Sequence, residues 1–211
     1  MFEFINDLNE FFCEKYAGYD KICTLPGYKM PKMHDVKVAE NGRKYTYTLP
    51  PETMRLAKQA SKVELLATLK ERLVDNTFSF SFFPLNIFGQ LHHLFSKLGV
   101  AKNLKKLLEK YNIPEEEACK GLAIEEEIWK GICGNKYLPT KNLIFSLALT
   151  QQLSYEDTEW LLSLIEEGFN FSYAKDVVIA YLLQKKIYNE EMIAAALAEY
   201  KVENLFIKKN A

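Results

Sequence analysis

The stretch from residue 104 to residue 149 decides the fold of the C-terminal half of this chain, and it reads LKKLLEKYNIPEEEACKGLAIEEEIWKGICGNKYLPTKNLIFSLAL. Its first apolar residues recur at helical spacing and predict an amphipathic helix: Leu104, Leu107, Leu108 and Tyr111. Pro114 then begins a short second helix. Proline suits the first helical position, and the glutamates that follow it suit the positive end of the helix dipole.

Two more helices are predicted in the same stretch. Gly121 ends the second helix, and an acidic start at residues 125–127 leads into the third helix, with Trp129 and Ile132 as buried anchors. Gly134-Asn135 is a helix stop, and Pro139-Thr140 precedes a fourth helix over residues 142–151. Two helices joined by a short turn form a helix-turn-helix unit, in which the second helix would read DNA.

The run from Ile113 to Leu149 resembles the phage-repressor (Cro-like, XRE-type) helix-turn-helix, and residues up to about 206 resemble a version with a two-helix C-terminal extension found in Gram-positive bacteria. The more specific matches are the turn Pro139-Thr140-Lys141 and the joint from Gly168 to Asp176. The resemblance implies a core of five helices and duplex DNA as the ligand. The helix 125–134 would be the reader, with phosphate contacts from Lys120, Lys130, Lys136 and Lys141.

The outward positions of the expected reader helix do not suit DNA. They include Glu125, Glu126 and Glu127, whereas base edges and phosphates require hydrogen-bond donors and cations. Residues 101–167 contain 8 lysines and 12 acidic residues, a net charge of −4. Three interpretations stay open: a solvated helix start that suits the dipole, an acidic patch that docks a protein, and a helix that reads DNA.

Composition excludes several protein classes. The chain has 211 residues, 48% of them hydrophobic, and a formal net charge of −1, so no global attraction to nucleic acid or to a membrane is expected. No apolar run is long enough to span a membrane, and the acidic N-terminus does not resemble a signal peptide. The four cysteines lack metal-binding spacing, so we expect a reduced, cytoplasmic protein.

The first 99 residues predict an α+β domain of unknown type. Apolar residues at three- and four-residue spacing predict a helix over residues 2–15. Two alternating runs around Asn41-Gly42 predict a β-hairpin, and helices are expected at 52–73 and 85–99. The fold is therefore expected to be mainly α, with domains at 1–99 and 100–167 and an extension at 168–211.

Two N-terminal features are candidates for docking a partner. Phe78 and Phe80 belong to a run in which phenylalanine and serine alternate, which indicates either a core strand or an exposed apolar surface. Arg43 and Lys44 lie at the predicted hairpin tip, which could contact nucleic acid or could simply be a solvated turn.

No catalytic residue, metal site or cofactor site is predicted. His92 and His93 are adjacent, so on a helix they diverge by about 100° and cannot hold one metal. His34 beside Asp35 could form an acid–base pair, although a surface turn is the simpler interpretation. The sequence contains no glycine-rich phosphate loop and no nucleophile elbow.

The C-terminal extension predicts two helices, at 176–183 and 190–200, with Met192, Ile193, Ala196 and Leu197 buried. They would cover the last face of the helical core or form the seam of a homodimer. Lys208 and Lys209 are expected to trail off as a mobile end. The sequence is therefore interpreted as a non-enzymatic, repressor-like transcriptional regulator that binds duplex DNA. The alternative is a protein-binding module, such as an inhibitor, antitoxin or phage-borne accessory factor, that docks through the acidic helix and the aromatic N-terminal surface.

Overall fold

The computed structural model describes residues 3–16, 34–38, 44–48, 66, 70, 99–171 and 173–208, and for the two strands it describes the backbone alone. The chain divides into two compact units, residues 3–73 and residues 74–211. The boundary predicted near residue 100 falls inside the second unit. Residues 74–98 lie outside the described part, so that boundary stays a prediction.

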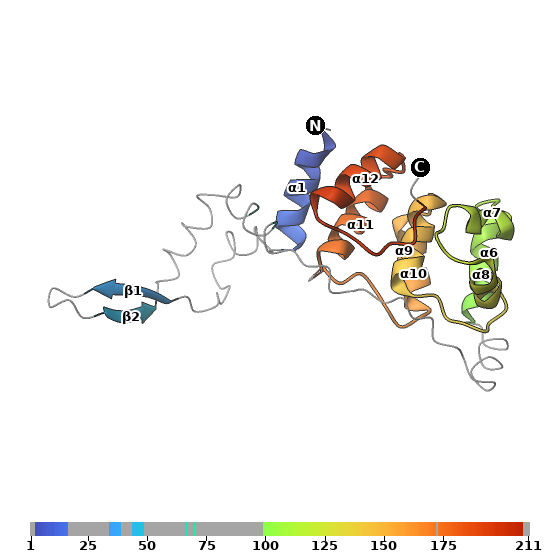
Figure 1. Ribbon diagram of the computed structural model, residues 1–211, viewed down its shortest axis with the longest axis horizontal. Helices are drawn as coiled ribbons and strands as arrows, with labels where there is room; N and C mark the ends of the chain where they lie inside the picture. Colours follow the sequence, from blue (N-terminus) through green and yellow to red (C-terminus); the bar gives the residue numbers. More distant parts are fainter. Residues whose placement is uncertain are drawn as a thin grey trace. The chain divides into compact units, whose positions relative to one another are not determined.

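The protein is mainly helical, with eight helices among the described residues (Figure 1). In the first unit, α1 spans Phe4–Lys15 and buries Ile5, Leu8, Phe12 and Cys13. Three of them belong to the predicted apolar stripe, whose other members, Phe4, Phe11 and Tyr16, are partly buried, whereas Cys13 was not predicted. The helix ends at the predicted residue. The Lys70 ammonium also donates a hydrogen bond to Asn9 Oδ1 at 3.0 Å within this unit.

Two short strands follow α1: β1 (His34–Val38) and β2 (Lys44–Thr48). They pair antiparallel, with His34 opposite Thr48 and Val38 opposite Lys44. The turn between them lies outside the described residues, as do most residues of the two helices predicted at 52–73 and 85–99. The α+β character of the N-terminal part therefore stays a prediction.

The second unit contains seven described helices. They are α6 (Val100–Lys110), α7 (Glu115–Lys120), α8 (Glu126–Cys133), α9 (Lys141–Thr150), α10 (Tyr155–Ser163), α11 (Ala174–Gln184) and α12 (Glu190–Glu199). The helices predicted in residues 104–151 are all present, and their bounds differ from the predicted ones by a few residues. In the extension, Ile193 and Ala196 are buried as predicted, whereas Met192 and Leu197 are only partly buried.

The core is built around α9 and α11, which are mostly apolar and are buried on all sides. Every residue of α9 from Asn142 to Leu149 is buried, and so is every residue of α11 from Lys175 to Leu183. A helix that is apolar all round belongs in a protein interior. α9 packs against both α10 and α11, and the amphipathic helices α6 and α12 cover the outside.

Caps fix where several of these helices begin. Thr140 Oγ1 accepts from the Leu143 N–H at 3.3 Å at the start of α9, and Ser154 Oγ accepts from the Asp157 N–H at 3.1 Å at the start of α10. The predicted stop at Gly134-Asn135 is confirmed. α8 ends there, and Asn135 adopts a left-handed conformation with φ of 59°.

Candidate functional site

The pair α7–α8 forms the candidate site, and a buried tryptophan fixes the angle between its helices. The Trp129 indole N–H on α8 donates to the Glu115 carbonyl at the start of α7, at 2.9 Å. Trp129 and Ile132 are buried, as predicted for the inward face of α8. Ala118 on α7 and Leu122 in the turn are also buried, so the two helices and their turn form one packed unit.

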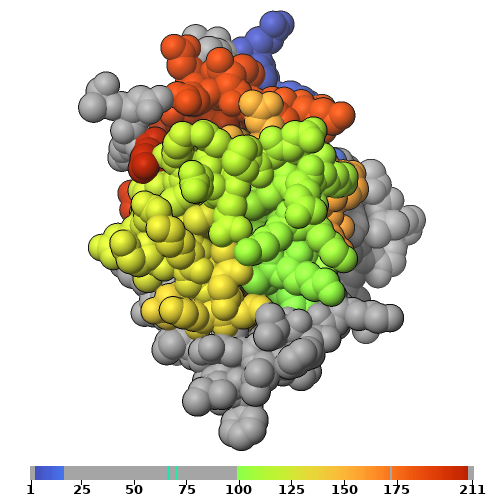
Figure 2. All heavy atoms as spheres, turned by 90° about the vertical axis from the view of Figure 1, so that its right-hand side faces the viewer, coloured from blue at the N-terminus to red at the C-terminus, as the bar shows by residue number. Residues whose placement is uncertain are grey.

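The outward face of this pair is acidic. Glu125, Glu126 and Glu127 are all exposed at the start of α8, and Glu116 and Glu117 are exposed on α7. Six glutamates and three lysines lie between residues 115 and 136, a net charge of −3. Figure 2 shows the surface of these helices in yellow-green, beside α6 in green. We call residues 116, 117, 125, 126 and 127 the acidic face.

Two of the four lysines predicted to contact DNA are paired within this face. Lys130 Nζ lies 2.5 Å from Glu126 Oε1 one turn earlier, and Lys120 pairs with Glu117. The hydrogen bond between Lys130 and Glu126 raises the pKa of the lysine and lowers the pKa of the glutamate. Both lysine charges are thus partly cancelled by their own helices.

Lys136 lies in the loop after α8 and is exposed. Within the described ranges it has no carboxylate at ion-pair distance. The other three predicted lysines each pair with a carboxylate, whereas the charge of Lys136 faces solvent without such a partner among the described residues. Lys208 is also exposed, beside the turn between α7 and α8. A DNA ligand would therefore meet these two lysines together with five exposed carboxylates, of which Glu117 and Glu126 are paired with lysines.

Lys141 lies largely inside the protein, with a side chain that is 17% exposed. Its Nζ lies 2.5 Å from Asp176 Oδ2 and donates to the Gly168 carbonyl at 2.6 Å. The turn at 139–141 and the joint at 168–176, the two segments that carry the resemblance most specifically, therefore meet at this lysine. Lys141 thus joins the start of α9 to the start of α11 through its ion pair with Asp176.

Asp176 is the centre of this polar cluster and is 1% exposed. Its Oδ2 also accepts from the Asn170 N–H at 2.6 Å, while its Oδ1 has no hydrogen-bond partner among the described residues. Burial raises the pKa of the Asp176 carboxyl, against the opposing effects of the Asn170 N–H and Lys141. Beside it, buried Lys175 donates to Asn142 Oδ1 at 3.3 Å.

A C-terminal segment covers the turn between α7 and α8, and this corrects the expectation that Lys208 trails off. The Ala123 N–H donates to the Phe206 carbonyl at 2.7 Å, and the Lys208 N–H donates to the Gly121 carbonyl at 3.1 Å. Between them, Leu122 and Ile207 form an antiparallel β-bridge. Lys209 lies outside the described residues. We call residues 202–208 the C-terminal strap.

The strap is anchored in the core by Phe206, which is buried and whose N–H donates to Ser146 Oγ at 2.8 Å. Sequence reasoning missed this contact, because its partners are 60 or more residues away along the chain. The available signal was the apolar run Leu205-Phe206-Ile207 after the last helix, which indicates a segment that packs.

The other predicted docking residues are not placed by the structure. Phe78, Phe80 and Arg43 lie outside the described residues, and Lys44 is described only as backbone in β2. Their roles stay predictions.

The described residues offer little reactive chemistry. They contain no group of histidine, cysteine and acidic side chains suited to hold a metal ion. Cys133 is buried, and burial raises its thiol pKa to about 12, so the reactive thiolate is disfavoured. A void of about 10 Å³ between α6, α8 and α9 is lined by Leu104, Trp129 and Leu143, and it is too small for a substrate.

None of the helices in the described ranges has both the length and the apolar character that a membrane crossing requires. No protein-family model, no curated protein and no solved structure matches this chain.

Proposed function

We propose that this protein is a non-enzymatic protein-binding module whose acidic face docks a basic protein surface. The single observation that supports this proposal is the exposure of Glu125, Glu126 and Glu127 together on the outward face of α8. A partner surface rich in arginine and lysine would complement this charge and would be steered toward it.

The packing of α7 and α8 supports docking by a preformed surface. Trp129 and its hydrogen bond to the Glu115 carbonyl fix the two helices against each other, so the backbone that carries the glutamates is ordered before a partner arrives. A surface that is already ordered loses less conformational freedom on binding. The strap adds to this order by pairing with the turn between the two helices.

The test is affinity capture from a lysate of the source organism with the purified protein as bait. The triple variant Glu125→Gln, Glu126→Gln, Glu127→Gln removes three charges from the acidic face. We expect it to lose the captured protein that the wild type retains. A control variant, Glu156→Gln, Glu166→Gln, Glu191→Gln, removes three exposed charges elsewhere and should retain it. Equal capture by both variants would refute docking through the acidic face.

A repressor-like regulator that binds duplex DNA is the second candidate. The order and lengths of α6 to α10 favour it, because they follow the helical order that the repressor resemblance implies. DNA binding would have to rely on Lys136, on Lys208 beside the turn, and on breaking the Lys130–Glu126 and Lys120–Glu117 pairs. Five exposed carboxylates would oppose the phosphates, since affinity for duplex DNA comes mainly from cation–phosphate contacts.

Selection from a random pool of duplex DNA at low salt tests this candidate. Enrichment of a discrete sequence, lost on Lys136→Glu, would support the regulator. An unenriched pool would favour the protein-binding module. Docking through the N-terminal residues, and a homodimer, are compatible with both candidate functions. Removing residues 1–98 in the same capture experiment would test whether the N-terminal residues take part in docking.

A further inference from the structure

The lysines of α6 fall into two groups. Lys105 pairs with Glu115 at 3.2 Å, and Lys110 pairs with Asp157 at 2.7 Å. Lys102 and Lys106 are exposed, four residues apart on one side of the helix, and neither has a carboxylate at ion-pair distance in the part of the chain that the structure describes. α6 as a whole carries four lysines and one glutamate, a net charge of +3.

An exposed tryptophan lies beside this helix. Trp160 on α10 is 40% exposed, one of two large hydrophobic residues exposed to this degree among the described residues. The residues that α10 buries are Thr158, Leu161 and Leu162, so Trp160 is not needed for the core. Its carbonyl accepts a hydrogen bond from the Ser163 hydroxyl at 2.6 Å, but its side chain has no hydrogen bond and no stacked ring in the described part of the structure.

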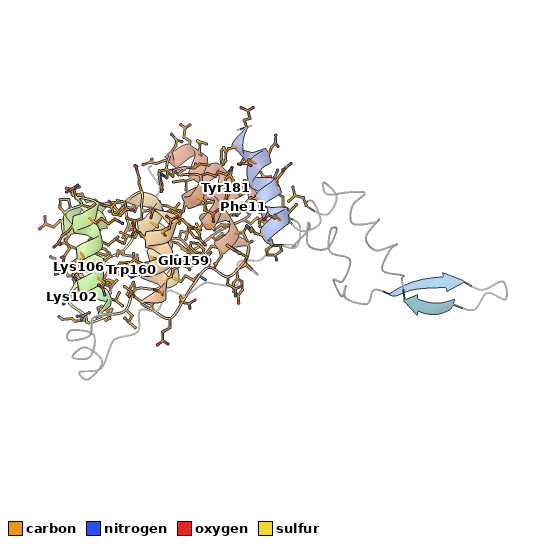
Figure 3. The ribbon with its side chains drawn as sticks, turned by 180° about the vertical axis from the view of Figure 1, so that it is seen from behind. Phe11, Lys102, Lys106, Glu159, Trp160 and Tyr181 are labelled. Atoms are coloured by element: carbon orange, nitrogen blue, oxygen red, sulfur yellow. The ribbon has the colours of Figure 1, made fainter. Side chains whose placement is uncertain are left out.

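The direction of α10 places Trp160 next to the unpaired lysines. α6 and α10 pack together and run antiparallel: Lys110 at the end of α6 contacts Asp157 at the start of α10, while Leu104, further back on α6, lines the same void as Leu161. Trp160 precedes Leu161 and so lies opposite the middle of α6. Figure 3 labels Lys102 and Lys106 on α6 and Trp160 on the adjacent α10.

We propose that Lys102, Lys106 and Trp160 form a second docking surface, which binds an acidic helical segment of a partner protein. Side chains four residues apart on a helix are about 6 Å apart, so two carboxylates spaced by one turn on a partner helix match the two ammonium groups. Trp160 would bury its ring against an apolar residue between those carboxylates. Tryptophan is enriched among residues that dominate binding energy at protein interfaces.

The surroundings favour an acidic peptide over a nucleic acid. Glu109 on α6 and Glu156 on α10 are also exposed. A continuous phosphate backbone that crossed these helices would pass close to both carboxylates and would be repelled by them. Glu159, beside Trp160 in sequence, accepts a hydrogen bond from the Tyr155 hydroxyl at 3.3 Å. Two discrete carboxylates on a short helix can reach Lys102 and Lys106 and avoid these glutamates.

This surface carries the opposite charge to the acidic face and lies on different helices. Docking of a peptide here and docking of a basic partner on the acidic face can therefore fail separately. The probe is a synthetic peptide of about twenty residues, long enough to form a helix in water, with glutamates four residues apart and leucines between them on one face. Binding is followed by two-dimensional NMR of the ¹⁵N-labelled full-length protein. Its two tryptophans give two indole signals, one from Trp160 and one from buried Trp129.

We expect the peptide to shift the Trp160 indole signal and to leave the Trp129 signal in place. The variant Lys102→Glu, Lys106→Glu should weaken the binding by at least about tenfold, because two attractive pairs become repulsive. The control Lys136→Glu changes an equally exposed lysine and should bind as the wild type does. The triple variant of the acidic face should also bind the peptide normally.

Four results would overturn the proposal. One is an unshifted Trp160 signal at saturating peptide, and another is equal weakening by Lys136→Glu. The third is a shift caused by single-stranded or duplex DNA in place of the peptide. A shift of Trp160 with protein concentration alone would assign the surface to a second copy of this chain and would also overturn it. An unchanged Trp129 signal verifies that each variant is folded.

Discussion

Gly131 on α8 lies where the ring of Tyr137 closes back on the helix. A Cβ atom at residue 131 would come within 2.4 Å of the Tyr137 ring carbons, a distance that real Cβ atoms do not reach. This close approach lets the loop after α8 fold back, and the Lys136 N–H donates to the Gly131 carbonyl at 2.7 Å. The glycine therefore shapes the end of the helix that carries the acidic face.

The substitution Gly131→Ala should destabilise the protein by about 1–3 kcal/mol, because the Tyr137 ring has to leave its site. Urea unfolding followed by circular dichroism measures this change. Gly168→Ala is the matched control, since no atom lies within 4 Å of a Cβ placed there. A loss of stability equal to that of the control would show that Tyr137 is not held against Gly131.

Asp157 makes folding stability depend on pH. Partial burial acts to raise the pKa of its carboxyl, but hydrogen bonds from Lys110 and Tyr111 outweigh burial and lower the pKa below its usual value near 3.8. A carboxyl whose pKa is lower in the folded state stabilises the fold above its unfolded pKa and loses that contribution as the pH falls through the folded pKa.

The wild type should therefore be more stable than Asp157→Asn at pH 7, and the difference should shrink as the pH falls below about 4. Urea unfolding at a series of pH values gives both curves. A difference that stays constant down to pH 2 would show that the ion pair does not contribute through the charge of Asp157.

At the scale of whole elements, periodicity and caps predicted the helices of residues 104–151 because those signals are local. Trp129 and Ile132 were assigned to the inside of α8 for the same reason. The role of Lys141 could not be predicted in this way, since its acceptors come from Gly168 and Asp176, 27 and 35 residues away, and only packing brings them together. A surface lysine and a buried one look alike in a sequence.

The substitution Asp176→Asn should destabilise the protein by about 3 kcal/mol, because it removes the buried partner of Lys141 and leaves this lysine only a longer pair with an exposed carboxylate. The exposed Glu167, whose carboxylate lies 3.8 Å from Lys141, is the matched control. Glu167→Gln should cost less than about 1 kcal/mol. Similar losses in the two variants, measured by urea unfolding, would contradict the central position of Asp176.

The strap gives a prediction at the same scale. Ser146→Ala removes the acceptor of the buried Phe206 N–H, which should cost about 1–3 kcal/mol. Amide hydrogen exchange of Phe206, Ala123 and Lys208 should accelerate in this variant. Ser163→Ala, which removes an exposed hydroxyl on α10, should leave these three amides unchanged. Unaltered exchange after Ser146→Ala would show that the strap is held without Ser146.

At the scale of the whole molecule, charge is arranged in opposite patches and no reactive centre was found in the described residues. Composition predicted a net charge near neutrality, but it could not predict that Lys120 and Lys130 pair within their own helices. It also could not predict that two lysines of α6 have no carboxylate at ion-pair distance among the described residues. The acidic character of residues 125–127 was visible in the sequence, because a helix start exposes most of its side chains.

Docking through the acidic face is tested most directly by a capture experiment with the 211-residue chain, in which the lysate is divided into nuclease-treated and untreated halves. We expect one stoichiometric protein to be recovered from both halves by the wild type and from neither by the Glu125, Glu126, Glu127→Gln variant. Recovery of a discrete DNA fragment from the untreated half, with no protein surviving nuclease, would contradict the claim and identify a DNA-binding regulator.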